Sequence, residues 1–243
     1  MSDIAVLFVM APPAGAGAVP GKPFNKIDNR EVFMRTIELY AKRDQVQQRI
    51  VCVLPDDLER LSQKYSAHLA FQGVSVTAGG PDWFGAVARG LEKLKPEIKT
   101  VFIHDACRPA VPYTLLDTLE TAVAQTGSAV PVSPIIGSLA RVKDQLLGDT
   151  HESRSLFLVG SPQVFRRDIL VHAYGRRNEI KVSPVDDAGL VRACGGQVAT
   201  VVDWGLNIRV DNDDAVKLAG DALKHLPKAR SKVPFSPFEE AQW

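Results

Sequence analysis

Residues 101–109 read VFIHDACRP, and this stretch decides how the chain is expected to fold. Its first four residues are typical of a buried strand, and Asp105 follows them directly. A strand that ends in an acid puts the carboxylate at the carboxyl edge of a parallel sheet, where open α/β proteins bind their ligands. Arg108 comes shortly afterwards, so a carboxylate and a guanidinium are both available for a metal-bound phosphate group. The alternative is an Asp–Arg pair that only shapes a turn.

The amino-terminal segment points to the same kind of ligand. Residues 4–10, IAVLFVM, form a continuous apolar run typical of a strand buried on both faces. Residues 11–23 are rich in Ala, Gly and Pro and include Lys22, so backbone N–H groups and one cation can approach a polyphosphate. The segment matches neither a Walker loop nor a dinucleotide fingerprint. A flexible connection is the alternative, but the position directly after the first strand favours a nucleotide-binding loop.

Composition limits the class of protein. The chain has 243 residues, of which 45% are hydrophobic, so residues 1–243 are expected to form one large α/β domain. The formal net charge of +1 argues against nucleic acid as a partner. We expect no membrane association and no signal peptide, because no apolar run has transmembrane length and the start lacks a basic and an apolar region. The three widely spaced cysteines favour a reducing cytoplasm.

Strands and helices are expected to alternate along the chain. Apolar or alternating runs predict strands at residues 4–10, 47–55, 73–80, 101–104, 128–133, 197–202 and 207–210. Helical patterns are expected at residues 30–43, 57–66, 83–94, 114–125, 166–177, 186–193 and 212–224. Such alternation predicts a doubly wound, mostly parallel sheet with helices on both faces.

The regular pattern breaks at residues 134–158, where an arm is expected. Residues 135–145 and 153–165 alternate like two antiparallel strands, joined by the polar stretch 146–152. A hairpin that projects from the sheet exposes its edges, and a partner subunit is the economical cover, so we infer a homodimer. The alternative is a hairpin folded back on its own domain. The tail, 226–243, has no periodicity and is expected to be loosely ordered or to pack on a neighbour.

Several short motifs occur in an order that resembles one known family, the 2-C-methyl-D-erythritol 4-phosphate cytidylyltransferases. The resemblance spans about residues 4 to 224, and its specificity comes from the collinearity of motifs that are individually weak. These motifs are the Gly/Ala loop with Lys22, Gly79-Gly80, residues 104–109, the hairpin with Ser138 and Arg154, Ser161-Pro162-Gln163, Asp186-Asp187-Ala188 and Asn207-Ile208-Arg209-Val210.

The resemblance implies a Rossmann-like nucleotidyltransferase fold and a specific reaction. CMP is transferred from CTP to 2-C-methyl-D-erythritol 4-phosphate with release of pyrophosphate, a step of isoprenoid precursor synthesis. It also implies Mg2+ as the cofactor, CTP and a polyol phosphate as ligands, and a cytoplasmic homodimer joined through the arm.

The same resemblance implies roles for individual residues. The catalytic residues are Lys22, Arg209 and Asp105, of which Asp105 also holds Mg2+. The nucleotide-binding residues are Pro12, Pro13, Ala14, Gly15, Ala16, Gly17, Gly80, Ala86 and Ala106. The residues for the sugar phosphate are Arg108, Ser138, Arg154 and Ser161, with Ser138 and Arg154 reaching the partner's site from the arm.

The chain also departs from the family's usual residues. Ala18 and Val19 replace a basic pair in the loop, Trp83 and Ala86 replace an Arg and a Ser, Ser138 replaces a Thr, Leu206 replaces an acid and Arg209 replaces a Lys. Arginine at 209 keeps the charge but changes the geometry. Two alternatives to an active enzyme for methylerythritol phosphate therefore stay open. One is a weakened or inactive homologue with a binding or regulatory role, and the other is a cytidylyltransferase for another polyol phosphate.

Two further residues of the 101–109 stretch are expected to have structural roles. His104 is expected to hydrogen-bond to the backbone, because an attacking phosphate needs no strong base. Cys107 is expected to fill space between Asp105 and Arg108 rather than act as a nucleophile.

Overall fold

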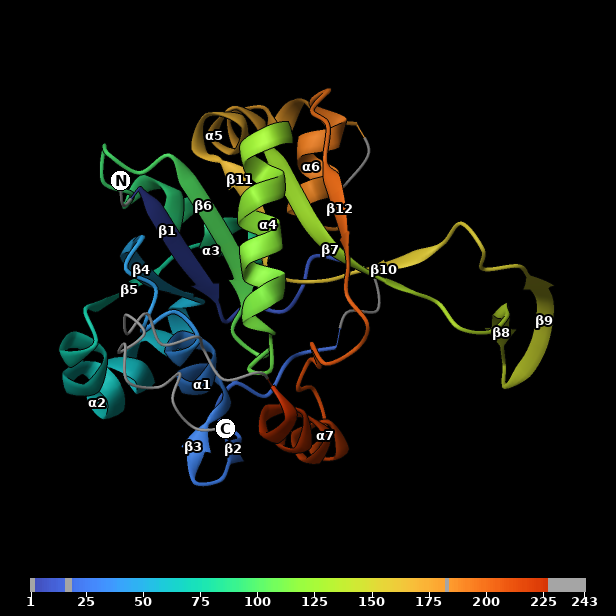
Figure 1. Ribbon diagram of the computed structural model, residues 1–243, viewed down its shortest axis with the longest axis horizontal. Coiled ribbons are helices and arrows are strands. Elements are labelled where there is room, and N and C mark those ends of the chain that lie inside the picture. The colour runs from blue at the N-terminus through green and yellow to red at the C-terminus, as the bar shows by residue number, and fades with distance from the viewer. Residues whose placement is uncertain (1–2, 16–18, 182–183, 227–243) are drawn as a thin grey trace, which may run out of the picture.

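The computed structural model describes residues 3–15, 19–181 and 184–226. Within these residues an eight-stranded sheet forms the centre of the fold (Figure 1). Along its main path the strand order is β10-β7-β11-β6-β1-β4-β5, and β12 pairs with β7 off this path. The strands are β1 (Ile4–Val9), β4 (Val46–Val53), β5 (Val74–Ala78), β6 (Thr100–Asp105), β7 (Ser128–Pro134), β10 (Phe157–Val159), β11 (Gln163–Arg166) and β12 (Ala199–Val202).

The sheet is mostly parallel, as the alternation of strands and helices predicts. β1 pairs in parallel with β4 and β6, β4 with β5, and β7 with β12. β11 lies antiparallel between β6 and β7, and β10 is antiparallel to β7. All six residues of β1 are buried, which explains why its sequence is apolar without alternation.

Helices cover both faces of the sheet, so the doubly wound α/β prediction is confirmed. Val6 and Phe8 of β1 face one core, whereas Leu7 and Val9 face the other. The first core is completed by α1 (Val32–Glu38), α2 (Pro55–Phe71) and α4 (Tyr113–Thr126). The second core is completed by α3 (Trp83–Glu92), α5 (Arg167–Gly175) and α6 (Asp187–Ala193). The remaining helical elements are η1 (Arg177–Glu179) and α7 (Asp213–His225).

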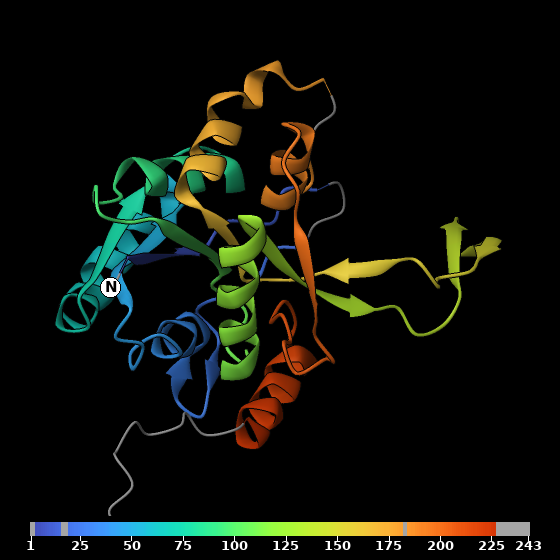
Figure 2. The same cartoon turned by 45° about the horizontal axis from the view of Figure 1, so that its top comes forward.

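An arm projects from the body of the molecule (Figures 1 and 2). It consists of β8 (Leu139–Lys143) and β9 (Leu146–His151), which pair antiparallel. The expected strands of this hairpin were wrong in detail, because the stretch expected to join them is itself β9. The turn lies at Asp144 and Gln145, whose φ angles are 51° and 64°. The second expected strand divides into β10 and β11, and both return to the main sheet.

Three other sequence expectations need correction. Residues 207–210 form no strand; instead, Val210 N donates to the Cys107 carbonyl and Lys22 N donates to the Val210 carbonyl. The helix expected at 30–43 is shorter, because β3 (Arg30–Glu31) pairs with β2 (Lys26–Ile27) before α1 begins. The helix expected at 57–66 extends to the full length of α2.

Residues 227–243 of the carboxyl-terminal tail lie outside the described residues. The expectation of a loosely ordered or packed tail concerns this part of the chain. Among the helices of the described ranges, none combines the length and the apolar character that a membrane crossing requires.

Candidate active site

The carboxyl ends of β1 and β6 are neighbours in the sheet, and a cleft opens beside them. Asp105 is the last residue of β6, and β1 leads into the segment that contains Pro13 and Ala14. The cleft has a volume of about 170 Å³. The predicted site residues among its lining are Pro13, Ala14, Asp105, Arg108, Ser161 and Arg209. The sheet therefore brings together residues from distant parts of the sequence at the edge where ligands are expected.

Three hydrogen bonds fix Asp105 in place. Arg209 Nε donates to the carboxylate oxygen Oδ2 at 2.6 Å, and the backbone N–H of Cys107 donates to Oδ1 at 2.9 Å. The backbone N–H of Asp105 donates to Ser161 Oγ at 2.8 Å, which fixes the end of β6. Burial disfavours the charge of Arg209, but the Asp105 carboxylate outweighs this, so the pKa of Arg209 is raised.

Arg108 lines the same cleft and is held there by hydrogen bonds to the segment that follows β12. Its Nη1 donates to the carbonyl oxygen of Asn207 at 2.7 Å, and Asn207 Nδ2 donates to the carbonyl oxygen of Ser161 at 2.6 Å. Among the described residues, the buried Nε of Arg108 has no hydrogen-bond partner. Burial lowers the pKa of this guanidinium. A buried donor without a partner is costly.

The backbone of Lys22 lies next to the Arg209-Val210 segment, because Lys22 N donates to the carbonyl oxygen of Val210. The Lys22 ammonium group points instead to Asp213. Its Nζ donates to Asp213 Oδ1 at 2.9 Å, and both side chains are exposed. An exposed ion pair contributes little to stability, so a phosphate can replace Asp213 at small cost. The structure therefore pairs Lys22 with the first turn of α7 and does not bring it into the lining of the cleft.

A second cleft, of about 540 Å³, lies between the amino-terminal loop and the start of α3. Its lining includes Pro12, Pro13, Ala14 and Gly15 of the predicted nucleotide-binding set. Ala16 and Gly17 of that set lie outside the described residues.

Gly80 precedes this helix start with a φ of 67°. A Cβ there would lie 2.3 Å from the Cα of Gly85, so only glycine fits.

Gly80 lines neither cleft, and two further predicted nucleotide-binding residues, Ala86 and Ala106, are not brought into either cleft. Ala86 is fully buried in the core beneath α3, and its backbone N–H donates to the carbonyl oxygen of Asp82. Ala106 is also fully buried, and its carbonyl oxygen accepts from Thr36 Oγ1 at 2.9 Å. Both residues therefore support the walls of the site rather than expose groups to a ligand.

The two predicted arm residues, Ser138 and Arg154, lie outside the cleft of their own chain. Both are exposed, and the Arg154 guanidinium contacts only Glu152, at 3.7 Å, among the charged groups of the described residues. Ser138 lies between β7 and β8 and Arg154 lies between β9 and β10, in the two segments that connect the main sheet to the projecting arm (Figure 2).

The cleft wall contains a buried cluster that sequence reasoning missed. Asp187, at the start of α6, accepts hydrogen bonds from Trp83 Nε1 at 2.8 Å and from the Tyr174 hydroxyl. Burial raises the pKa of Asp187 to about 6, although both hydrogen bonds oppose this shift. The adjacent acids at 186 and 187 were a visible signal, but no motif linked them to Trp83.

His104 and Cys107 have the structural roles expected of them. His104 is buried, its Nδ1 lies 2.8 Å from the Tyr40 hydroxyl, and its Nε2 lies 3.2 Å from the carbonyl oxygen of Arg108. Burial lowers the pKa of His104 to about 3, so it is neutral near pH 7. Burial raises the pKa of the Cys107 thiol, and a Cβ on Gly21 would meet its Sγ at 2.3 Å. The thiol therefore fills space and is not activated.

The donor set suits Mg2+ only when a phosphate ligand is also present. Residues 3–15, 19–181 and 184–226 contain no cluster of three or more His, Cys, Asp or Glu side chains that could hold a metal. Mg2+ commonly takes one or two carboxylates and completes its shell with water and substrate phosphates. Asp105, which lines the cleft, can supply one such carboxylate.

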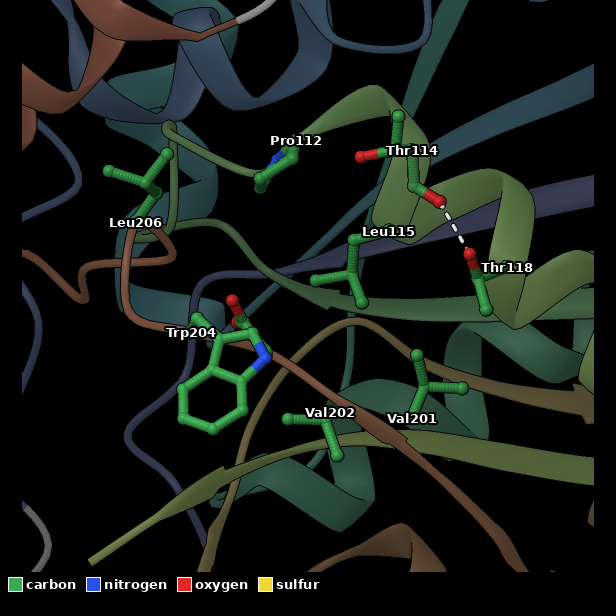
Figure 3. Close-up of a pocket in the computed structure, with 9 residues that line it drawn as sticks. Pro112, Thr114, Leu115, Thr118, Val201, Val202, Trp204 and Leu206 are labelled. Carbon is green, nitrogen blue, oxygen red and sulfur yellow. Dashed lines mark hydrogen bonds between the residues drawn. The ribbon is translucent and has the colours of Figure 1, made fainter. Parts of the chain in front are cut away.

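Another cleft, of about 630 Å³, lies elsewhere, between α4 and β12 (Figure 3). Its lining is Pro112, Thr114, Leu115, Thr118, Val201, Val202, Asp203, Trp204 and Leu206. No Lys or Arg occurs in this lining, so it does not suit a polyanionic substrate.

Together, the fold and the charged edge of the sheet define an α/β nucleotidyltransferase. A sequence profile of the family described as IspD, 2-C-methyl-D-erythritol 4-phosphate cytidylyltransferase, matches residues 7–225. The chain therefore belongs to this family, as its motifs predict.

Curated relatives and solved structures agree with this assignment. The 2-C-methyl-D-erythritol 4-phosphate cytidylyltransferase of Deinococcus radiodurans is 32% identical over 197 residues, which cover 79% of this chain and 78% of the relative. That of Bacillus pumilus is 28% identical over 216 residues, covering 87% and 94%. The crystal structure of the Thermus thermophilus enzyme of the same name superimposes with a TM-score of 0.75 at 25% identity, covering 92% of this chain and all of that one.

Proposed function

We propose that this chain transfers CMP from CTP to 2-C-methyl-D-erythritol 4-phosphate and releases pyrophosphate. The observation that carries the proposal is the ion pair between Asp105 and Arg209 at the carboxyl end of β6, beside Arg108, in a member of this family. A carboxylate and two guanidinium groups at one sheet edge suit two polyanionic substrates that must be held together.

The reaction needs no covalent nucleophile from the protein. A phosphate oxygen of the polyol phosphate attacks the α-phosphorus of CTP, and the bond from that phosphorus to the bridging oxygen breaks. Pyrophosphate leaves with the electron pair. The attacking group is already an anion, so a neutral His104 is no obstacle.

The protein's own residues supply charge and orientation. Arg209 and Lys22 stabilise the charge that develops at the α-phosphorus and on the leaving group. Arg108, which lines the cleft, binds the phosphate of the polyol through its guanidinium. Ser161 holds the end of β6 and thereby orients Asp105.

Asp105 would hold Mg2+ together with phosphate oxygens of the nucleotide. When bound, the ion neutralises triphosphate charge and favours departure of pyrophosphate. Arg209 must share or release Oδ2 of Asp105 for this contact, since Nε now occupies that oxygen.

The nucleotide would lie along the loop and the start of α3. Pro12, Pro13, Ala14 and Gly15 line the larger of the two clefts at this edge, and Gly80 lets the turn before α3 pack closely against Gly85. Ala16 and Gly17 lie outside the described residues, and their role in binding the nucleotide stays a prediction. Ala86 and Ala106 contribute by packing beneath the site.

A homodimer joined by the arm accounts for the arm's exposed apolar surface. Val142, Leu146 and Leu147 are 69%, 73% and 72% exposed, which is unfavourable for a hairpin standing in water. In the dimer, Ser138 and Arg154 would reach the partner's cleft and bind the polyol phosphate there. The rest of the chain would act as a single nucleotidyltransferase domain in the cytoplasm.

A non-catalytic binding role remains the second candidate. It is favoured by Val19, an exposed apolar residue where related proteins usually have a cation, and by the buried Ala86. A reaction with another polyol phosphate uses the same site and differs only in the arm-side contacts.

A pyrophosphate-release assay tests these alternatives directly. Purified protein is incubated with CTP, Mg2+ and either 2-C-methyl-D-erythritol 4-phosphate or other polyol phosphates. Release with the first acceptor above all others supports the proposal. Release only with another acceptor changes the substrate, and no release with any acceptor leaves the binding role.

A further inference from the structure

Two charged side chains are part of the lining of the cleft between the amino-terminal loop and α3. They are Asp82, directly before the helix, and Arg177 in η1. The remaining lining residues are apolar or glycine, among them Pro13, Trp83 and Phe84. An apolar cleft with few polar groups takes a flat organic ligand and orients it through those groups.

Both charged side chains are held in place. Asp82 Oδ1 accepts the backbone N–H of Gly85 at 2.7 Å and so caps α3. Its other oxygen, Oδ2, accepts from Arg177 Nη2 at 3.2 Å. The guanidinium of Arg177 also lies 4.5 Å over the ring centroid of Phe84. A hydrogen-bond acceptor, the Asp82 carboxylate, and a group with several N–H donors, the Arg177 guanidinium, are therefore fixed next to each other.

The pair remains accessible to a ligand. The side chain of Asp82 is 47% exposed and that of Arg177 is 34% exposed. By contrast, Ala86 has no polar side-chain atom and is buried. Among the described residues of this cleft, Asp82 and Arg177 are thus the charged groups available to read a base.

Resting on the proposed cytidylyltransferase function, we propose that Asp82 and Arg177 select cytosine over uracil. Cytosine presents an amino donor at N4 beside ring acceptors at N3 and O2, and carboxylates accept from that amino group. Asp82 Oδ2 accepts from N4, and Arg177 donates to the neighbouring acceptors. Uracil presents the reverse order, with an acceptor at O4 beside a donor at N3. Its O4 would face the carboxylate, leaving polar groups without partners.

The test measures kcat/KM for CTP and for UTP at a fixed concentration of the acceptor. Asp82→Asn keeps an oxygen to cap α3 but replaces the other oxygen with an amide donor, which suits O4 of uracil. We expect the CTP-to-UTP ratio to fall about tenfold or more. Arg177→Gln removes the charged donor, and we expect the CTP affinity and the ratio to fall by a similar factor.

Arg176→Gln is the matched control. Arg176 is the neighbouring arginine, is exposed and pairs with Glu179 at 2.9 Å, so its loss should leave the ratio unchanged. If the Asp82–Arg177 pair only ties η1 to α3, Arg177→Gln lowers the melting temperature without changing the ratio, and the proposal is wrong. The proposal is also overturned if the parent protein prefers GTP, or if it does not discriminate between CTP and UTP.

Calorimetry with CTP and UTP separates this inference from the proposed function. If no nucleotide supports pyrophosphate release, catalysis as proposed fails, yet the relative affinities still report on the base contact. Equal affinities for CTP and UTP in the parent would contradict the role of the pair whether or not the protein is active.

Discussion

Arg209 Nε donates to Asp105 Oδ2 at 2.6 Å, although the two residues are 104 positions apart in the chain. The side chains are 14% and 6% exposed, so each charge depends on the other for compensation. Arg209 Nη1 also donates to the carbonyl oxygen of Val19 at 2.8 Å. The pair thus joins the end of β6, the segment after β12 and the amino-terminal loop at one point.

Asp105→Asn should abolish Mg2+-dependent binding of CTP while the fold persists. An amide oxygen can still accept the N–H of Cys107, but the group no longer has a charge to offer the metal. Calorimetry with CTP in the presence and absence of Mg2+ measures this loss, and circular dichroism checks the fold. Asp221→Asn, an exposed change on α7, serves as the control. Equal affinity for CTP in mutant and parent would remove Asp105 from the metal site.

Arg154→Gln and Arg209→Gln should complement each other if the arm serves the partner's cleft. Each variant alone should lose turnover, by about 10²–10³ for a contact that stabilises charge in the transition state. In a mixed dimer, the arm of the Arg209→Gln chain meets the cleft of the Arg154→Gln chain, and that site is intact. About one quarter of the sites should then be active after random exchange. Mixing that restores no activity would show that Arg154 does not act across a dimer.

Replacing residues 136–155 with a two-residue Asn-Gly turn should produce a folded monomer. β7 and β10 pair at Pro134 and Phe157, so a tight turn can close them without disturbing the main sheet. Light scattering measures the mass, and calorimetry should show that CTP binding survives while the polyol phosphate no longer binds. A shortened protein that remains dimeric would place the dimer contact elsewhere.

The sheet was predictable from sequence because β1, β4 and β6 are apolar runs separated by helical patterns. The projecting hairpin was also predicted, but the bounds of its strands were not, because Asp144 and Gln145 turn the chain with positive φ and carry no glycine signal. β11 is a four-residue strand whose place between β6 and β7 depends on pairing with distant segments.

The residues of the candidate site also divide into those that the sequence predicted and those that it did not. Asp105 and Arg108 stand at a strand end that sequence reveals, and family motifs pointed to Arg209. No sequence pattern marked Arg177, whose contact with Asp82 spans 95 positions and arises from the packing of η1 against α3. The alternation of apolar residues at 207–210 predicted a strand. The segment is held instead by isolated backbone hydrogen bonds of Val210 to Cys107 and Lys22, beside the site.

Asp187→Asn should change how stability depends on pH. The carboxyl group has a pKa of 3.8 as its ordinary value and about 6 in the buried site. Between these values the folded state keeps a proton that the unfolded state releases, so the contribution of Asp187 to stability falls as the pH rises from about 4 to 6 and is level above.

The amide lacks this titration and can still accept from Trp83 Nε1. Relative to the parent, the variant should therefore gain up to about 3 kcal/mol in free energy of unfolding between pH 4 and pH 7. Urea unfolding at several pH values measures the difference. A difference that stays constant across this range would mean that Asp187 does not titrate as its burial requires.

Val19→Arg separates an active enzyme from a non-catalytic homologue. Val19 is exposed, and its carbonyl oxygen accepts from Arg209, so an arginine side chain there would begin next to the cation already at the site. If the protein is an enzyme weakened by the missing loop cation, turnover with CTP should rise about tenfold or more, since the new charge acts where negative charge develops. Turnover that stays at background in both proteins would favour the binding role, because one cation does not rebuild a remodelled site. A parent that is already fast and is slowed by the change would mean that Lys22 or Arg209 has taken over the role, and that the loop is not deficient.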